Sequence, residues 1–268
     1  MHLPGGLACG RKRLRDAAFR PLDGHTELAL AEGALSGASV PLRVTGALAA
    51  ALDHIGGQPV TAEIARDLCV GDRQFLMRQL AVRMGTDRMW LTARCHCCGE
   101  AMDLCVENST LPVKPAGRGY PFARVSAGRR AWRFRVPTGR DQEAIADIAD
   151  PAEAADELLR RCWAPTKSGP ASPPRFSPDA MARIEAAMDD VAPQVATEAA
   201  TTCPACGEAL GVPVDPYALL LLGERSFFSE VHTLASAYHW SEGEILAMPR
   251  ARRQVYLKLI DEARGMAH

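Results

Sequence analysis

No excess of charge of either sign marks this sequence of 268 residues, in which 31 lysines and arginines are balanced by 32 aspartates and glutamates. A protein that binds nucleic acid or an anionic membrane usually has a basic excess over a whole domain, so the balance argues against both classes. No apolar run approaches the roughly 20 residues that span a bilayer. The charged first residues also lack the apolar core of a secretory signal. We therefore expect a soluble, cytoplasmic protein with no membrane partner.

The sequence also lacks the motifs of the common enzyme classes. There is no phosphate-binding G-x-x-x-x-G-K-S/T loop, no dinucleotide-binding G-x-G-x-x-G, no G-x-S-x-G elbow and no H-E-x-x-H. The acidic residues between positions 141 and 157 have the spacing of helix starts and solvent faces. Cys97 has no candidate base except its neighbour His96. These absences predict a non-enzymatic protein with no catalytic residues, no bound organic cofactor and no small-molecule substrate.

Cysteine is abundant, with nine residues at positions 9, 69, 95, 97, 98, 105, 162, 203 and 206. The odd number and the missing export signal argue against a disulfide framework. The motif C-x-x-C-G-E-A occurs twice, and we name the two copies the first knuckle (95–101) and the second knuckle (203–209). Two thiolates at this spacing can bind one metal ion, and the following glycine lets the chain turn so that backbone amides face the sulfurs.

Four thiolates from two knuckles complete a tetrahedral zinc shell with no open position, which is the pattern of a structural site. We therefore predict one structural Zn²⁺ bound by four residues: Cys95, Cys98, Cys203 and Cys206.

The first knuckle leaves alternatives for the ligand set. His96, Cys97 and Cys105 lie in or near it, whereas its alignment with the second knuckle favours Cys95 and Cys98. A thiol redox enzyme is a further alternative, although neither pair opens a helix after a strand as a thioredoxin-type motif does. The remaining cysteines are expected to pack as small apolar side chains, namely Cys9, Cys69 and Cys162.

The pattern along the chain predicts an α+β fold that is mainly helical. The extended runs 89–94 and 102–106 flank the first knuckle and place it at the tip of a β-hairpin. Apolar residues at helical spacing predict a helix over 42–55, which ends at two glycines. Capping boxes at Thr138–Asp141 and Ser241–Glu244 predict two further helix starts.

These elements predict four regions. They are a basic flexible arm over 1–20, a helical region over 21–94, a split four-cysteine zinc ribbon over 95–214 with halves 95–106 and 203–214, and a helical C-terminal region over 215–268. The chain between the ribbon halves would add a β-hairpin, helices and a proline-rich linker over 164–178. One metal ion would thereby join distant parts of the chain into one unit.

Residues 114–140 contain eight basic residues and no acidic one. Alternation within this stretch predicts a strand with Trp132, Phe134 and Val136 on one face and Arg133 and Arg135 on the other. Such a face is typical of a half-buried strand, and acidic residues over 141–162 balance its charge. A zinc-ribbon regulator that binds nucleic acid with this basic hairpin is the alternative function.

Three stretches carry a resemblance to a known family. Residues 70–80, and residues 134–144 together with 158–162, resemble the T4-family baseplate hub assembly chaperones of contractile phage tails and phage-like contractile injection systems. Residues 230–249 are similar to small helical baseplate-associated proteins, in which an aromatic-rich helix precedes a short S-x-x-E helix.

The resemblance implies a non-enzymatic assembly or structural protein. It would bind baseplate, hub, spike or tail-tube proteins and could stay in the assembled particle. The candidate contact surfaces are the Arg133 and Arg135 strand face and the end of the C-terminal aromatic helix, at Tyr238, His239 and Trp240.

Overall fold

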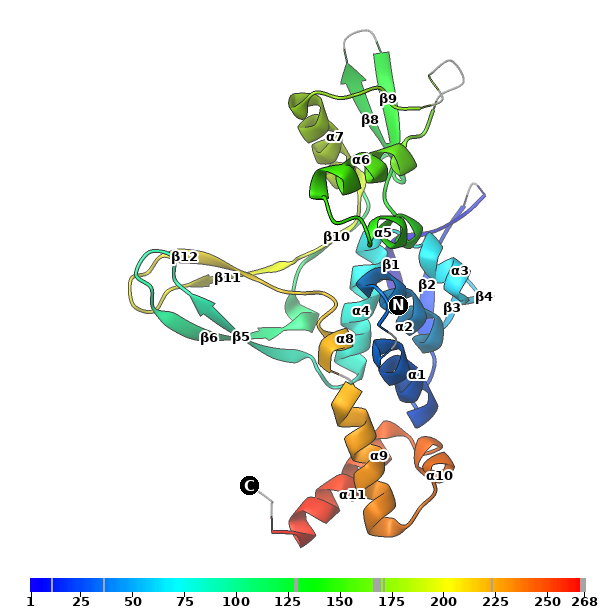
Figure 1. Ribbon diagram of the computed structural model, residues 1–268, viewed down its shortest axis with the longest axis vertical. Coiled ribbons are helices and arrows are strands. Elements are labelled where there is room, and N and C mark those ends of the chain that lie inside the picture. Colours follow the sequence, from blue (N-terminus) through cyan, green and yellow to red (C-terminus); the bar gives the residue numbers. More distant parts are fainter. Residues whose placement is uncertain are drawn as a thin grey trace.

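The structure is a computed structural model that describes residues 1–10, 12–35, 37–127, 130–165, 170, 172–222 and 224–265. Helices and strands are both present, which confirms the α+β class in its broad form. A central body carries an upper lobe, a lower lobe and a long lateral arm (Figure 1). Within these ranges, no helix is both long enough and apolar enough to cross a membrane.

The central body packs helices against a small antiparallel sheet. The sheet has the order β1 (His2–Cys9), β2 (Lys12–Phe19), β3 (Leu52–Ile55) and β4 (Gln58–Pro59). The helices of the body are α1 (Gly24–Leu35), α2 (Val40–Ala51), α3 (Ala62–Asp67), α4 (Val70–Arg83), α5 (Gly139–Ile145) and α8 (Leu219–Leu222). The apolar faces of α1, α2, α3, α4 and α8 meet in one core, which includes Leu48, Leu52, Ile55, Leu68, Leu76, Met77 and Leu80.

The prediction of a flexible arm over residues 1–20 was wrong. Strands β1 and β2 pair with each other, and β2 pairs with β3. Leu3 and Ala17 are fully buried in the central core. The amides of Gly5 and Gly6 donate to the carboxylate of Asp72 in α4. The segment is therefore ordered by long-range contacts that its own composition does not reveal.

The helix expected over 42–55 is shorter than predicted. Helix α2 ends at Ala51, and Leu52 takes an extended conformation as its C-cap. The next residues form β3, in which Ile55 pairs with Ala17 of β2. Pairing with β2 therefore replaces the last helical turn that the apolar spacing predicts. The chain then turns at Gly56, which has a φ of 59°.

The upper lobe is the insertion expected between the two knuckles. It contains β8 (Phe122–Ala127), β9 (Arg130–Arg135), α6 (Pro151–Cys162) and α7 (Pro178–Val191). Phe134 and Ile184 are fully buried in its core. The predicted hairpin and the predicted capping box at Thr138 are confirmed, whereas the hairpin turn at Gly128 and residues 166–169 and 171 of the predicted linker lie outside the described residues.

The lower lobe is helical, as expected for the C-terminal region. It consists of α9 (Glu224–Tyr238), α10 (Glu242–Leu246) and α11 (Arg250–Ala263), which close on Leu234, Ile245 and Ile260. The capping box of Ser241 and Glu244 is confirmed at the start of α10. The lobe is fastened to the central body by a buried ion pair, because Arg253 of α11 binds Glu27 of α1.

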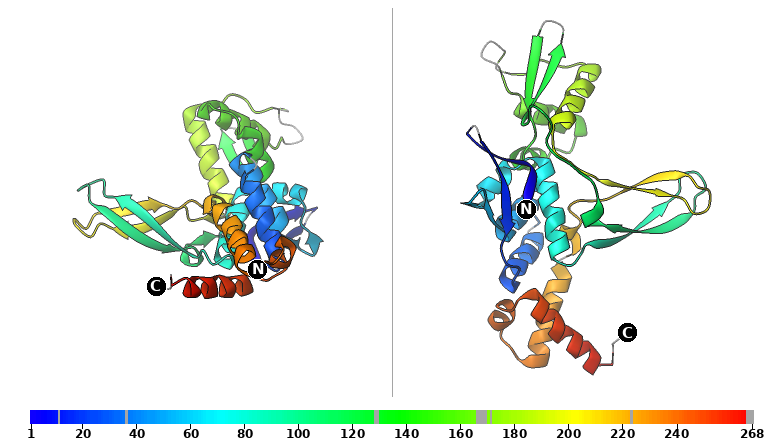
Figure 2. Two further views of the ribbon diagram at one scale, coloured as in Figure 1. Left: turned by 60° about the horizontal axis from the view of Figure 1, so that its bottom comes forward. Right: turned by 180° about the vertical axis from the view of Figure 1, so that it is seen from behind.

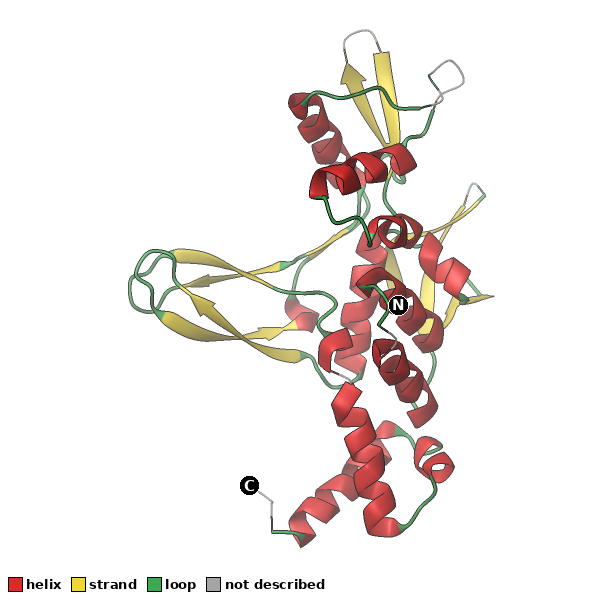
Figure 3. Ribbon diagram, viewed as in Figure 1, coloured by secondary structure: helices red, strands yellow, loops and turns green. Residues whose placement is uncertain are grey.

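The lateral arm is made of two antiparallel hairpins, which we name the cysteine arm. Their strands are β5 (Arg88–Arg94) with β6 (Ala101–Glu107), and β11 (Glu198–Thr202) with β12 (Ala209–Pro213). At the base, a short 3-10 helix (Asn108–Thr110) precedes β7 (Val113–Lys114), which pairs with β10 (Gln194–Val195). The arm contains strands and loops (Figure 3), and the view from behind shows it standing away from the body (Figure 2).

Candidate metal centre

The four cysteines predicted as ligands meet at the tip of the cysteine arm. Their sulfur atoms all lie within 4.8 Å of one another. Across the two knuckles, the Sγ–Sγ distance is 3.7 Å from Cys95 to Cys206 and 3.6 Å from Cys98 to Cys203. Four sulfurs at about 2.3 Å from one zinc ion would lie about 3.8 Å apart, so the cluster has the size of a tetrahedral metal shell.

Each knuckle is shaped by the same backbone hydrogen bonds. The amide of Cys95 donates to the carbonyl of Glu100 at 2.8 Å, and the amide of Gly99 donates to the carbonyl of Cys95 at 3.0 Å. In the second knuckle the amide of Cys203 donates to the carbonyl of Glu208 at 2.8 Å, and the amide of Gly207 donates to the carbonyl of Cys203 at 2.9 Å. Gly99 and Gly207 have φ values of 77° and 76°, which L side chains rarely adopt. The repeated sequence therefore produces two matching half-sites.

The local electrostatics favour a thiolate at Cys95. Its pKa is lowered to about 6, first by the backbone N–H of Cys98 and then by that of Cys97, although desolvation acts in the opposite direction. The thiolate is the form that binds metal. Cys95 and Cys203 are buried, whereas Cys98 and Cys206 are exposed at the tip. The donor set and its geometry fit one metal ion.

The alternative ligands of the first knuckle do not join this cluster. Cys97 is exposed, and Cys105 lies on β6 opposite Trp90. The Nε2 atom of His96 lies 3.7 Å from a carboxylate oxygen of Glu208 in the second knuckle. His96 therefore links the two turns from outside the sulfur cluster.

The three cysteines expected to pack as apolar side chains divide into two groups. Cys69 and Cys162 are buried, as predicted, and burial raises the pKa of the Cys162 thiol to about 12. Cys9 is exposed at the end of β1, so the expectation of packing was wrong for this residue.

The basic strand face at Arg133 and Arg135 is engaged within the molecule. Both nitrogens at the end of Arg135 donate to the carboxylate of Asp141, at 2.8 and 3.0 Å. The guanidinium of Arg133 lies over the ring of Phe122, 4.5 Å from its centroid. Neither side chain is a free surface cation. Arg129, which belongs to the same basic stretch, lies outside the described residues.

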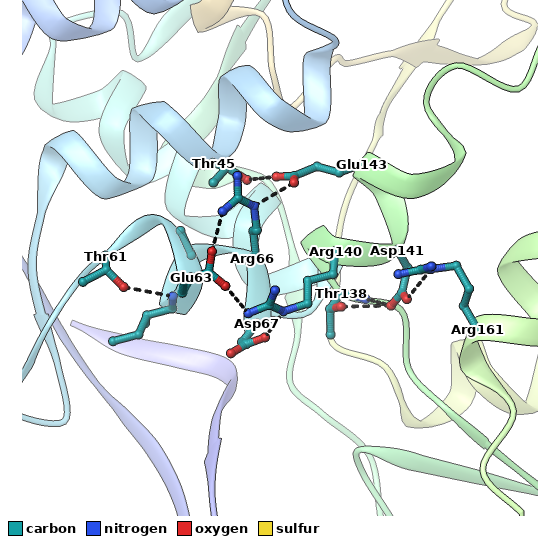
Figure 4. Close-up of polar contacts among 12 residues, drawn as sticks. Thr45, Thr61, Glu63, Arg66, Asp67, Thr138, Arg140, Asp141, Glu143 and Arg161 are labelled. Atoms are coloured by element: carbon teal, nitrogen blue, oxygen red, sulfur yellow. Dashed lines mark hydrogen bonds and ion pairs between the residues drawn. The ribbon is translucent and has the colours of Figure 1, made fainter.

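Within the central body, a polar network joins α5 to α2 and α3 (Figure 4). Arg140 pairs with Glu63 and Asp67 of α3, and Glu143 accepts hydrogen bonds from Arg66 and Thr45. Each charged group in this set has a partner of opposite sign. The network therefore fixes α5, from which the chain continues into α6 of the upper lobe, on the central body.

The aromatic end of α9 lies partly in the core of the lower lobe. The rings of Tyr238 and Trp240 stack with centroids 4.5 Å apart, and Tyr256 of α11 packs edge-on against Trp240 at 4.8 Å. His239 is exposed and has a φ of 56°, which marks the end of the helix. Of the three contact residues predicted here, His239 is exposed and Tyr238 and Trp240 are half-buried.

Trp90 is an exposed aromatic residue that does not belong to the predicted contact surfaces. Its side chain is 73% exposed on the outer face of β5, whereas Met89 and Leu91 face the inner side of the arm. The alternation of residues 89–94 contained this signal, because it placed Trp90 on the face opposite the apolar residues.

Comparisons with protein-family models, with curated proteins and with solved structures give no match for this chain.

Proposed function

We propose that this chain is a non-enzymatic assembly or structural protein of a contractile phage-like tail. In this proposal it binds baseplate, hub, spike or tail-tube subunits through protein contacts, and one structural zinc ion makes its cysteine arm rigid. The observation that carries the proposal is the closed set of four thiols at the tip of a projecting arm. Four thiolate ligands leave a zinc ion no open position for substrate, which is the pattern of structural sites.

Trp90 gives the arm a contact residue. Large aromatic side chains supply much of the binding energy at protein interfaces, and an exposed tryptophan on a rigid hairpin is ready to contact a partner. The described residues of β5 on the same outer face are Arg88, Thr92 and Arg94, and none of them is acidic. The opposing outward residues of β6 include Asp103 and Glu107. Glu107 pairs with Arg88 and Asp103 accepts a hydrogen bond from Thr92, so a partner that matches this face would present an apolar pocket for Trp90.

The contractile-tail setting rests on the family resemblance, and one packing relation supports it. Two of the three stretches that carry the resemblance, 70–80 and 134–144, lie beside each other. The amide of Val70 donates to the carbonyl of Pro137, and the amide of Gly139 donates to that of Leu68. Gly139 also packs directly against the guanidinium of Arg73. This adjacency of the first two stretches supports the proposal, whereas the third stretch, 230–249, lies in the lower lobe.

Binding to purified tail subunits tests the proposal. We expect the full chain to capture a baseplate, hub, spike or tail-tube subunit in a pull-down, and Trp90→Ala to weaken that binding about tenfold or more while its metal content stays unchanged. Phe228→Ala, which removes an exposed aromatic ring from the lower lobe, is the matched control and should bind normally. A chain that binds none of these subunits would contradict the proposed function.

A further inference from the structure

The upper lobe contains an apolar groove between α6 and α7 with negative charge at its edge. The groove has a volume of about 280 Å³, and its lining includes Leu158 of α6 and Met181 and Met188 of α7. Its only charged lining residues are Glu185 and Asp189. Neither carboxylate has an ion-pair partner within the described ranges. Methionine side chains adapt to different shapes, so the groove is suited to an apolar segment with a basic flank.

The outer face of α11 presents an apolar stripe. Val255 and Leu259 are 59% and 48% exposed, and they lie one helical turn apart on the same side of the helix. We name these two residues the α11 stripe. Arg253 and Ile260, by contrast, are buried against the rest of the molecule. The helix therefore has one face in the lobe and a second apolar face that is open to solvent.

The border of the α11 stripe has two basic residues and one acidic residue, because Glu262 lies three residues after Leu259. Arg252 and Lys258 lie three residues before and three residues after Val255, so both flank the stripe. Arg252 has no ion-pair partner among the described residues, and its guanidinium lies over the ring of Tyr256, 5.7 Å from the centroid. Lys258 lies 3.8 Å from Glu262. The stripe thus has the composition that complements the α6–α7 groove.

One copy of the chain cannot bring these two surfaces together. The groove belongs to the upper lobe, and α11 belongs to the lower lobe at the other end of the longest axis (Figure 1). The central body lies between them. A contact between the two surfaces therefore requires two molecules.

We propose that the chain self-associates head to tail, with the α11 stripe of one copy in the α6–α7 groove of the next. The two basic residues at the border of the stripe would then approach Glu185 and Asp189, so that apolar burial and opposite charge act together. Each added copy leaves one free groove and one free stripe. A head-to-tail contact of this kind produces open chains or closed rings, whereas two copies that place their stripes reciprocally in each other's groove would stop at a two-fold dimer. It uses neither the cysteine arm nor Trp90, so it does not depend on the proposed partner.

Sedimentation of the metal-loaded full chain over a micromolar to submillimolar range tests the contact. We expect the average mass of the wild type to rise beyond that of a dimer. A groove variant, Glu185→Lys with Asp189→Lys, and a stripe variant, Val255→Ser with Leu259→Ser, should each weaken association about tenfold or more. All four substitutions are at exposed positions, so both variants should keep the fold of the wild type.

Mixing the two variants separates this contact from other modes of association. The intact stripe of the groove variant can still enter the intact groove of the stripe variant. The mixture should therefore form a one-to-one dimer that grows no further. Asp190→Lys and Leu42→Ser are the matched controls, because each changes an exposed residue outside the groove and the stripe. Both should associate as the wild type does.

Four results would overturn the proposal. They are a wild type that stays monomeric throughout the range, a wild type that stops at a symmetric dimer, variants that associate as the wild type does, and a mixture that yields no dimer. The first of these would leave the groove to a different partner.

Discussion

Asp141 of α5 connects the central body to β9 and α6 of the upper lobe through one carboxylate. It accepts hydrogen bonds from Arg135 of β9 and from Arg161 of α6. As the second member of the capping box, it also accepts one from the backbone amide of Thr138, the N-cap residue of α5. Burial acts to raise the pKa of Asp141, but the hydrogen bonds from Arg135 and Thr138 outweigh it, and the pKa lies below its ordinary value. The ionised form is therefore the one that the folded state favours.

We expect Asp141→Asn to destabilise the protein by about 2 kcal/mol at neutral pH, because charged hydrogen bonds to two arginines are lost. A carboxyl whose folded pKa is lowered contributes stability above its unfolded pKa of about 3.9, and that contribution disappears as the pH falls through the folded value. The difference in free energy of unfolding between the wild type and Asp141→Asn should therefore shrink below about pH 4. Urea unfolding at a series of pH values measures it.

The control for this prediction is Asp190→Asn, which changes an exposed carboxylate with no ion-pair partner among the described residues. It should change stability by less than about 0.5 kcal/mol. A difference at Asp141 that stays constant down to the acid range would show that its charge is not what stabilises the lobe.

Two glycines in helices make a second test at the scale of single residues. Replacing a helical glycine by alanine usually stabilises a protein by about 0.5–1 kcal/mol. We expect this gain for Gly46→Ala in α2, where an added Cβ would meet open space. Gly71→Ala in α4 should instead cost about 2 kcal/mol, because its Cβ would collide with the carbonyl oxygen of Pro193. Thermal unfolding of the two variants distinguishes the cases, and a stabilised Gly71→Ala would show that this close approach is absent.

The cysteine arm is the element whose stability should depend most on metal. Its core is small, with Val106, Ala199 and Val214 as its buried centre. We expect one zinc ion per chain by elemental analysis. The double variant Cys203→Ser with Cys206→Ser should lose the ion and, with it, hydrogen-exchange protection of β5, β6, β11 and β12. The amides of the central body, which has a larger core, should keep their protection from hydrogen exchange.

Cys97→Ser is the matched control for the arm, because it removes a thiol from the same turn without touching the four-sulfur cluster. It should retain both the metal and the protection. Loss of the metal in Cys97→Ser, or full retention in the double variant, would refute this ligand set.

Elements whose signals are local could be predicted from the sequence. The capping boxes at Thr138 and Ser241 and the hairpin around the first knuckle depend on residues only a few positions apart. Strand β1 could not be predicted, because its sequence contains proline and glycine and lacks alternation. It forms because Asp72, more than sixty residues away, accepts its amides. Contacts of this range leave no pattern within the strand itself.

In the candidate site, too, local signals could be predicted from the sequence and long-range contacts could not. The repeated C-x-x-C-G-E-A motif identified all four clustered cysteines, because spacing alone sets the geometry of each knuckle. The contact surfaces were harder to predict. Arg135 has the spacing of an outward residue, and only the structure places Asp141 beside it. Exposure depends on which neighbours cover a face, and those neighbours come from distant segments.

At the scale of the whole molecule, the lower lobe joins the central body mainly through α1. At one point, Leu28 and Ala31 of α1 pack in an apolar cluster with Phe227, Val231 and Leu246 of the lower lobe, and Gly24 lies directly against the backbone of Leu246. At a second point, Glu27 binds both Arg253 and Arg250 of α11. Glu27 and Arg253 are 2% and 0% exposed, so this ion pair is removed from water. A buried pair of this kind fixes orientation, and removal of one partner leaves the other poorly compensated.

We therefore expect Arg253→Met to destabilise the attachment by about 3 kcal/mol. The cost should appear first as faster hydrogen exchange in α9, α10 and α11, while the central body stays protected, because the lobe can open as a local unit. The double variant Glu27→Gln with Arg253→Met should cost less than the sum of its single variants, since it leaves no uncompensated buried charge. Arg264→Met removes an exposed charge at the end of the same helix, outside the α11 stripe, and should change exchange little. Uniform loss of protection across the whole chain in Arg253→Met would mean that lobe and body unfold together, so that the ion pair belongs to one continuous cooperative unit.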